Sequence, residues 1–181
     1  MMTGPLINRI ENAAIQEAIN GMIKNIAYNH QDTNRLCVVG IANGGIILGR
    51  WIVERLRAIL RGTIEYGIVN ILFHRDDLKT KPIPKIAFPA NLPFDIEEEK
   101  ILLVDDVISS GRTVRAAIND LFDQGRPEQI ELAVLFDRGN RRLPFQTDYL
   151  GFHKEIPLTQ KVIVTIDDKN PAEKSLIVIS K

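Results

Sequence analysis

The segment at residues 101–115, ILLVDDVISSGRTVR, constrains the fold of this chain more than any other part of its sequence. It begins with an apolar run typical of a strand that is buried on both faces, and such strands are typical of parallel α/β sheets. The run ends in two adjacent carboxylates, Asp105 and Asp106, and a turn of small residues then leads into a helical pattern. Because α/β sheets bind ligands at the carboxyl ends of their strands, the acidic pair marks a candidate binding site.

The turn after the acidic pair has the composition of a phosphate site. Its backbone N–H groups, its hydroxyls and the start of the following helix are groups that bind anions. The residues concerned are Ser109, Ser110, Gly111, Arg112 and Thr113. Carboxylates beside such a turn can accept hydrogen bonds from ribose hydroxyls and attract Mg²⁺. Alone, the acidic pair is more often a solvated turn and the small-residue turn a helix cap, but together they predict a ribose 5-phosphate site.

Strand and helix patterns alternate along the chain and predict its fold class. We expect an α/β fold with a mostly parallel central sheet of about five strands, flanking helices and a small hood subdomain built from terminal segments. One domain over residues 1–181 is expected, with a long flexible loop inserted at about residues 74–95. Helical spacing occurs at residues 8–28, 46–60 and 114–122, and β-rich runs occur at residues 35–41, 65–73, 130–136, 148–152, 161–166 and 175–179.

Composition excludes several classes of protein. Lys and Arg number 23 and balance 23 Asp and Glu, so only a local patch could attract nucleic acid or an anionic membrane. The single cysteine, Cys37, lies in an apolar strand pattern, where it cannot form an internal disulfide and is expected to be an inert core thiol. The sequence has no run of eighteen uncharged apolar residues, and we expect a cytoplasmic protein.

Residues 104–113, VDDVISSGRT, resemble the phosphoribosyl-diphosphate (PRPP) signature of the type I phosphoribosyltransferases. Further runs make most of the chain similar to the PyrR family, whose members are uracil phosphoribosyltransferases and attenuation regulators of pyrimidine operons. The resemblance implies the type I phosphoribosyltransferase fold and conversion of uracil and PRPP to UMP and pyrophosphate, with Mg²⁺. The runs are VGI followed by GGIILGR, RDDL, VDDVISSGRTVRAAI, QGRP, LAVLFDRGNRRLP and TDYLG.

The resemblance gives each candidate residue a role. Asp105 and Asp106 would be catalytic residues that hold the ribose hydroxyls directly or through Mg²⁺, and residues 109–113 would anchor the 5-phosphate. The loop Asn43, Gly44 and Gly45 would bring backbone N–H groups against the pyrophosphate, although its composition also suits an ordinary strand-to-helix turn.

Two further segments complete the expected site. Arg75, at the start of the long loop, is a candidate catalytic residue that would close over the leaving group, and the same run also suits a solvated turn. Asp137, Arg138 and Gly139 would lie near the base, although a charged pair can also simply end a strand. Purine-salvage relatives typically carry an aspartate at the position of Ser109, so the hydroxyl favours a pyrimidine acceptor.

The sequence departs from the family pattern in the pyrophosphate loop. Ala42 and Gly44 stand where family members commonly have basic residues, and each lost charged contact would weaken binding by about 1.5–3 kcal/mol. Weak turnover is one consequence that the sequence leaves open.

The RNA-binding features of family regulators are also reduced. The family's DRGHRELP-type run reads DRGNRRLP here, so Asn140 replaces His, whereas Arg141 remains and Arg142 is added. The first helix offers Asn20, Gly21 and Lys24 where more basic side chains would be expected. Binding of an mRNA leader is therefore ranked below catalysis.

Three functions stay open at this level. The first is a uracil phosphoribosyltransferase, the second a UMP-sensing RNA-binding regulator with weak or no catalysis, and the third a phosphoribosyltransferase for another base. Family resemblance suggests a homodimer or larger homo-oligomer, with the apolar face around residues 46–51 as one candidate contact surface.

Overall fold

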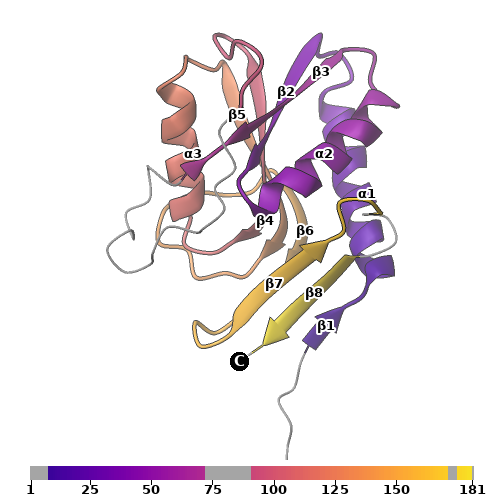
Figure 1. The fold of residues 1–181 in the computed structure, drawn as a ribbon, viewed down its shortest axis with the longest axis vertical. Coiled ribbons are helices and arrows are strands. Elements are labelled where there is room, and N and C mark those ends of the chain that lie inside the picture. Colours follow the sequence, from indigo (N-terminus) through magenta and orange to yellow (C-terminus); the bar gives the residue numbers. More distant parts are fainter. Residues whose placement is uncertain (1–7, 72–90, 171–174, 181) are drawn as a thin grey trace, which may run out of the picture.

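The computed structural model describes residues 8–71, 91–170 and 175–180 (Figure 1). A five-stranded parallel sheet in the order β3-β2-β4-β5-β6 forms its centre, which confirms the predicted fold class. Helices α1 (Asn12–Asn29) and α2 (Gly44–Arg57) cover one face and α3 (Arg112–Phe122) covers the other. The strands are β2 (Arg35–Ile41), β3 (Thr63–Val69), β4 (Lys100–Ile108), β5 (Gln129–Asp137) and β6 (Tyr149–His153).

Two hydrophobic layers hold the helices on the sheet. Alternate side chains of β2 and β4 point to opposite faces, so Val38 and Leu102 pack under α1 and α2, whereas Val39 and Leu103 pack under α3. Burial on both faces explains why the central strands are apolar throughout. Cys37 is buried in the α3 layer, as expected, and burial raises the pKa of its thiol to about 11.

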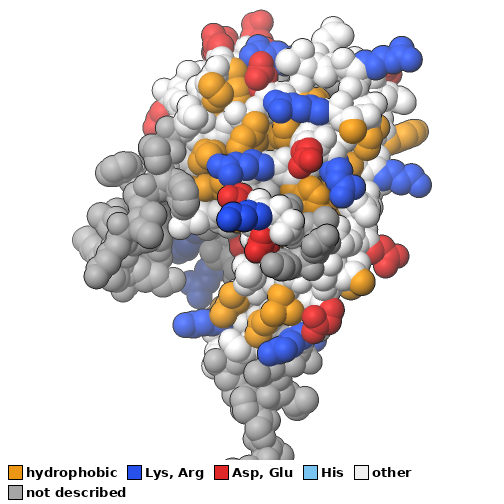
Figure 2. Space-filling view, turned by 45° about the vertical axis from the view of Figure 1, so that its right-hand side comes forward, with side chains coloured by type: hydrophobic (Ala, Val, Ile, Leu, Met, Phe, Trp, Pro, Cys, Tyr) orange, Lys and Arg blue, Asp and Glu red, His pale blue; other side chains and the backbone are white. Residues whose placement is uncertain are grey.

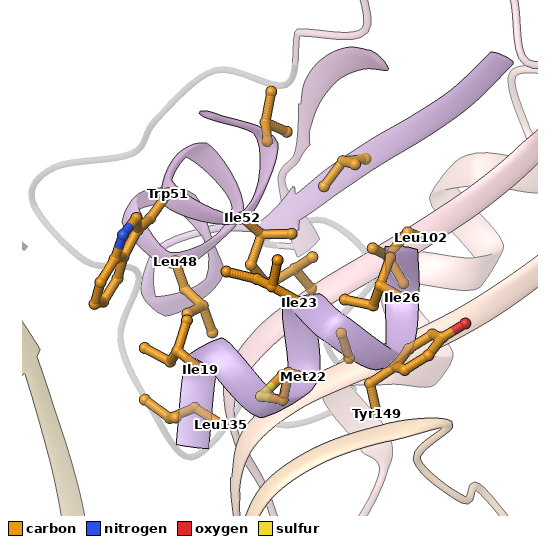
Figure 3. Close-up of a cluster of buried hydrophobic side chains, with 14 of the residues drawn as sticks. Ile19, Met22, Ile23, Ile26, Leu48, Trp51, Ile52, Leu102, Leu135 and Tyr149 are labelled. Carbon is orange, nitrogen blue, oxygen red and sulfur yellow. The ribbon is translucent and has the colours of Figure 1, made fainter. Parts of the chain in front are cut away.

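The face at residues 46–51 was expected to be a candidate oligomer surface, and the structure contradicts this. Ile46, Leu48 and Trp51 are at most 4% exposed, and Leu48 and Trp51 belong to the hydrophobic layer that α1, α2 and the sheet form within the same chain. Figure 3 shows Leu48 and Trp51 beside Ile19 of α1 in this layer. The helical spacing identified an apolar face correctly, but spacing alone does not tell an intramolecular contact from an intermolecular one.

A second, antiparallel sheet forms the hood. It joins β1 (Asn8–Ile10), β8 (Ser175–Ser180) and β7 (Lys161–Ile166) in that order, and it contains the terminal hairpin expected from the sequence. The helix predicted from residue 8 is wrong at its start: residues 8–10 pair with residues 177–179 of β8, and the helix begins at Asn12. Pairing with a strand about 170 residues away cannot be read from local periodicity.

Other boundaries differ by a few residues. The strand expected at residues 65–73 spans Thr63–Val69, and the second helix begins at Gly44, so the glycine pair already belongs to its first turn. Of the long loop expected at residues 74–95, the part up to residue 90 lies outside the described residues, as does Arg75. Within the described part of the chain, no helix is both long and apolar enough to span a bilayer.

A polar network joins α1 to β5 and β6 near the amino ends of these strands. His30 Nε2 lies 2.6 Å from Glu131 Oε2, and the Tyr149 hydroxyl donates to the same oxygen at 3.1 Å. Asn29 donates to the Tyr149 hydroxyl, and His30 Nδ1 lies 3.2 Å from the Thr33 hydroxyl. The hydrogen bond with His30 lowers the pKa of Glu131 although burial opposes the shift, so the network stabilises the charged carboxylate.

Replacing Glu131 by Gln should therefore destabilise the fold in a pH-dependent manner. A depressed pKa contributes stability above the ordinary carboxyl pKa of about 4.3, and that contribution is lost as the pH falls through the lower folded value. We expect Glu131→Gln to lower the free energy of unfolding by about 1.5–3 kcal/mol near neutral pH and by much less at about pH 3. Urea denaturation at both pH values measures this, with exposed Glu17→Gln as the control. An equal loss at both pH values would contradict it.

Candidate active site

The acidic pair lies at the carboxyl end of β4, as the sequence predicts. Asp105 is 5% exposed and Asp106 is half-buried. Their side chains alternate along the strand, so Asp106 lies on the α2 side of the sheet. The backbone N–H of Asp106 donates to Asp105 Oδ1 at 3.0 Å, which orients the more buried carboxyl.

Burial disfavours the ionised form of both carboxyl groups. Burial raises the pKa of Asp105 well above its usual range, and the neighbouring charge of Asp106 raises it further. Burial also raises the pKa of Asp106, although hydrogen bonds partly offset the shift. A hydroxyl donor or a cation that met these groups would lower the free energy of their charged forms. The pair is therefore suited to bind a ligand that brings such groups.

The loop between β2 and α2 lies directly against this acidic pair. A Cβ atom at Gly44 would overlap the carboxylate of Asp106, and a Cβ atom at Gly45 would overlap the carbonyl oxygen of Val104. The peptide bond between Ala42 and Asn43 is cis. Sequence reasoning treated Gly44 as the loss of a basic residue, whereas the structure shows that the missing side chain makes room for Asp106.

The hood closes this part of the site from one side. A cavity of about 390 Å³ lies between the loop, the acidic pair and β7. It is open to the backbone of the small-residue loop and to one carboxylate, which makes it large and polar enough for part of a phosphorylated sugar. Its lining residues are Asn43, Gly44, Ile47, Asp106, Val164, Thr165 and Ile166.

The candidate phosphate turn follows β4 and starts α3. Gly111 is the N-cap residue of α3 and has a φ of 86°, in the left-handed region that favours glycine. The hydroxyl oxygen of Ser110 accepts from the Arg112 N–H at 3.4 Å, and its carbonyl accepts from the N–H groups of Arg142 and Leu143. The turn is thus held from outside by residues 142–143, so its shape does not depend on a bound phosphate.

The charged residues after β5 mainly hold the protein's own loops. Asp137 forms a two-pronged ion pair with Arg141, with N–O distances of 2.8 and 3.1 Å, and accepts from the Gly139 N–H. The guanidinium of Arg138 donates to the carbonyl oxygens of Pro157 and Gln160, each at 3.0 Å. Both side chains therefore shape the segment expected near the base through contacts within the chain.

Arg141 links two segments of the candidate site, which the sequence did not reveal. Besides its pair with Asp137, its guanidinium donates to the carbonyl of Ser109 at 2.7 Å and to that of Phe145 at 3.1 Å. It therefore ties the phosphate turn to the loop after β5. The spacing of Asp137 and Arg141, four residues apart, was the only signal available, and outside a helix that spacing does not predict contact.

Neutralising Asp105 should stabilise the protein near neutral pH. Its pKa is raised in the fold, so the wild type loses stability as the pH rises above about 4, while the unfolded chain ionises and the folded chain does not. Asp105→Asn keeps the acceptor oxygen for the Asp106 N–H and removes this loss. We expect a higher melting temperature than wild type at neutral pH and an equal one at about pH 3.

The matched control is Asp32→Asn, a substitution at an exposed residue. The melting temperature of this variant should equal that of the wild type at both pH values. A melting temperature for Asp105→Asn below that of wild type at neutral pH would show that the carboxylate is a structural requirement.

Comparison with known proteins agrees with this fold. A model of the phosphoribosyl transferase domain matches residues 8–169. Solved structures of hypoxanthine phosphoribosyltransferases are similar in fold: that of Trypanosoma cruzi has a TM-score of 0.65 at 18% identity and covers 93% of both chains, and that of Staphylococcus aureus has 0.63 at 18%, with 90% of this chain and 82% of that one covered.

Relatives that are closer in sequence are named Bifunctional protein PyrR. The Listeria monocytogenes protein is 41% identical over 175 residues, with 93% of this chain and 94% of the relative covered, and the Bacillus subtilis protein is 37% identical over 161 residues, with 88% and 89% covered. The Ralstonia nicotianae protein is 56% identical over 114 residues, and the match spans 63% of each chain. With its fold, its acidic strand end and these matches, the chain belongs to the type I phosphoribosyltransferases and, within them, to the PyrR family.

Proposed function

We propose that this protein is a uracil phosphoribosyltransferase, which converts uracil and PRPP to UMP and pyrophosphate. One observation carries the proposal: the acidic pair, the candidate phosphate turn and a loop with two adjacent glycines meet at the carboxyl edge of one sheet, beside the hood. These three parts correspond in chemistry to the ribose, the 5-phosphate and the pyrophosphate of PRPP. The PyrR relatives are named bifunctional proteins, which supports membership of a family with two activities.

In this reaction the C1–pyrophosphate bond breaks through a transition state with oxocarbenium character. The turn at residues 109–113 would bind the 5-phosphate and so orient C1, which is remote from it. Asp105 and Asp106 would accept hydrogen bonds from the ribose hydroxyls, and their negative charge would stabilise the positive charge that develops on the sugar. Their raised pKa values mean that bound hydroxyls or cations favour the ionised pair that this role needs.

The residues present fit a magnesium ion that arrives with the substrate. Among the described residues no group of three or more His, Cys, Asp and Glu could hold a metal by itself. Mg²⁺ typically keeps several waters and binds through one or two carboxylates plus substrate phosphates, a role that Asp105 and Asp106 suit. When bound, the ion would neutralise charge on the leaving pyrophosphate.

The pyrophosphate would lie against Asn43, Gly44 and Gly45. Lys and Arg are absent from this loop, so binding would rest on backbone N–H groups and on the metal ion. Arg75, outside the described residues, is the basic group that we propose closes over the leaving group. This division of roles predicts weaker PRPP binding than in relatives with basic loops.

The base would lie near Asp137, Arg138 and Gly139, the segment whose shape the Asp137–Arg141 pair maintains. The hydroxyl of Ser109 in place of a carboxylate favours a pyrimidine, because a hydroxyl can both donate and accept toward the carbonyl and N–H groups of uracil.

A UMP-sensing RNA-binding regulator is the second candidate, and the absence of basic side chains from the pyrophosphate loop favours it. Charge argues against it as the main function: Figure 2 shows a face on which basic and acidic side chains alternate around hydrophobic ones. In addition, the guanidinium of Arg141 is already bound to Asp137. Binding of a pyrimidine-operon leader RNA across salt concentrations, with and without UMP, tests this candidate, and no UMP-dependent binding would reject it.

The main proposal is tested by an acceptor panel. Purified protein with PRPP and Mg²⁺ should release pyrophosphate with uracil, and much less with cytosine, hypoxanthine, guanine or adenine. Pyrophosphate release measured by a coupled assay, with UMP identified by mass spectrometry, gives the result. Turnover with a purine alone would reassign the acceptor. No turnover with any base would reject the proposed phosphoribosyltransferase activity.

The contact between the Gly44 backbone and the Asp106 carboxylate can be tested by substitution. Gly44→Ala places a methyl group where the Asp106 carboxylate lies, so either the acid or the loop must move. A shift of about 1 Å in a site of this kind can reduce kcat/KM by about 100-fold, and we expect a loss of that order for PRPP.

The control is Gly21→Ala in α1, where an added Cβ meets no atom within 4 Å. That variant should keep full activity and gain about 0.5–1 kcal/mol of stability, because alanine favours a helix over glycine. Full activity of Gly44→Ala would show that the two groups need not be in contact.

A further inference from the structure

We propose that Tyr66 of β3 is a positioning residue for the pyrophosphate loop: its hydroxyl donates a hydrogen bond to the carbonyl oxygen of Ile46 in the first turn of α2, at 2.7 Å. This inference rests on the proposed function, because it concerns the loop that would bind the leaving group. Tyr66 lies outside every sequence motif that identified the site, and its side chain reaches the loop from the neighbouring edge strand.

Two glycines leave the space that the tyrosine side chain uses. A Cβ at Gly40 of β2 would lie 2.9 Å from the Tyr66 hydroxyl and 2.8 Å from the carbonyl oxygen of Gly45. A Cβ at Gly49 of α2 would lie 3.0 Å from the ring carbon Cε2. The ring thus passes between β2 and α2, and its hydroxyl, the Gly45 carbonyl and the Gly40 backbone meet beneath the loop.

The glycine backbone of the loop lies against Asp106 and Val104 of β4, and the Tyr66 hydroxyl adds a side-chain hydrogen bond at the loop's helical end. Asn43 precedes α2 and makes no side-chain cap hydrogen bond, and Gly44 and Gly45 carry no side chains that could pack. The bond from the Ile46 N–H to the Asn43 carbonyl is 3.3 Å long. Glycine-rich backbone has the greatest conformational freedom. A hydrogen bond from the Tyr66 hydroxyl to Ile46, one residue beyond Gly45, should therefore restrict the conformations of the loop strongly.

The hydroxyl is suited to remain a donor under physiological conditions. Burial raises the pKa of Tyr66 to about 12, and the positive charge of Arg50 on α2 only partly opposes this. Arg50 in turn pairs with Asp168, which follows β7 of the hood, at 3.3 Å. The phenol is therefore neutral near pH 7, and a neutral phenol beside a carbonyl oxygen donates.

The test compares Tyr66→Phe with Tyr149→Phe in the full chain. Each variant removes one hydrogen-bonded tyrosine hydroxyl, but that of Tyr149 belongs to the network at the opposite end of the sheet. Two readouts are used: hydrogen–deuterium exchange of residues 42–47, which needs no ligand, and the KM for PRPP and for uracil.

We expect Tyr66→Phe to speed exchange of residues 42–47 and to raise the KM for PRPP by about fivefold to tenfold, with the KM for uracil unchanged. Tyr149→Phe should lower the melting temperature at least as much as Tyr66→Phe does. It should change neither the exchange of residues 42–47 nor the KM values. Unchanged exchange of the loop in Tyr66→Phe, or an equal increase in both variants, would overturn the proposal. If the wild type transfers the phosphoribosyl group to no base, the proposed function fails, and the exchange comparison alone decides whether Tyr66 positions the loop.

Discussion

The contact between the Asp106 carboxylate and the backbone of Gly44 is the constraint on which the site depends. Strands β2 and β4 are neighbours in a parallel sheet, so the segments that follow them emerge side by side at one edge. Strand β4 brings two carboxylates to this edge, and the loop that follows β2 must pass directly against them. A side chain at Gly44 or Gly45 would collide with β4, and so the loop is built of residues that present backbone instead. The same absence of side chains leaves the loop without basic groups.

Stability and binding are separated along the strands. Near the amino ends of β5 and β6, a histidine, a glutamate and a tyrosine form a network that stabilises the charged carboxylate of Glu131. At the carboxyl end of β4, burial instead raises the pKa of Asp105 and Asp106, which lowers stability near neutral pH at the place where we propose that the substrate binds. The buried acids at the two ends therefore have pKa shifts of opposite sign, and Asp106 lines the cavity beside the hood.

Much of this arrangement was predictable from sequence. Apolar runs located the central strands, and the rule that parallel strands end at a common edge predicts that the candidate loops lie together. Contacts between distant segments were not predictable. Residues 8–10 were taken for helix because only β8 makes them a strand, and the face around residues 46–51 was taken for surface because its packing partners are distant in sequence. Arg141 and Tyr66 carry no local signal for the carbonyl oxygens that they bind. Local pattern describes which faces are apolar, whereas tertiary partners decide what each polar group does.

A crystal structure of the protein with PRPP and Mg²⁺ tests the central claim most directly. The account predicts the ribose hydroxyls at the carboxylates of Asp105 and Asp106, the 5-phosphate in the turn at residues 109–113, and the pyrophosphate against the backbone of Gly44 and Gly45. A ligand bound elsewhere, or a ribose that leaves both carboxylates without a contact, would contradict it.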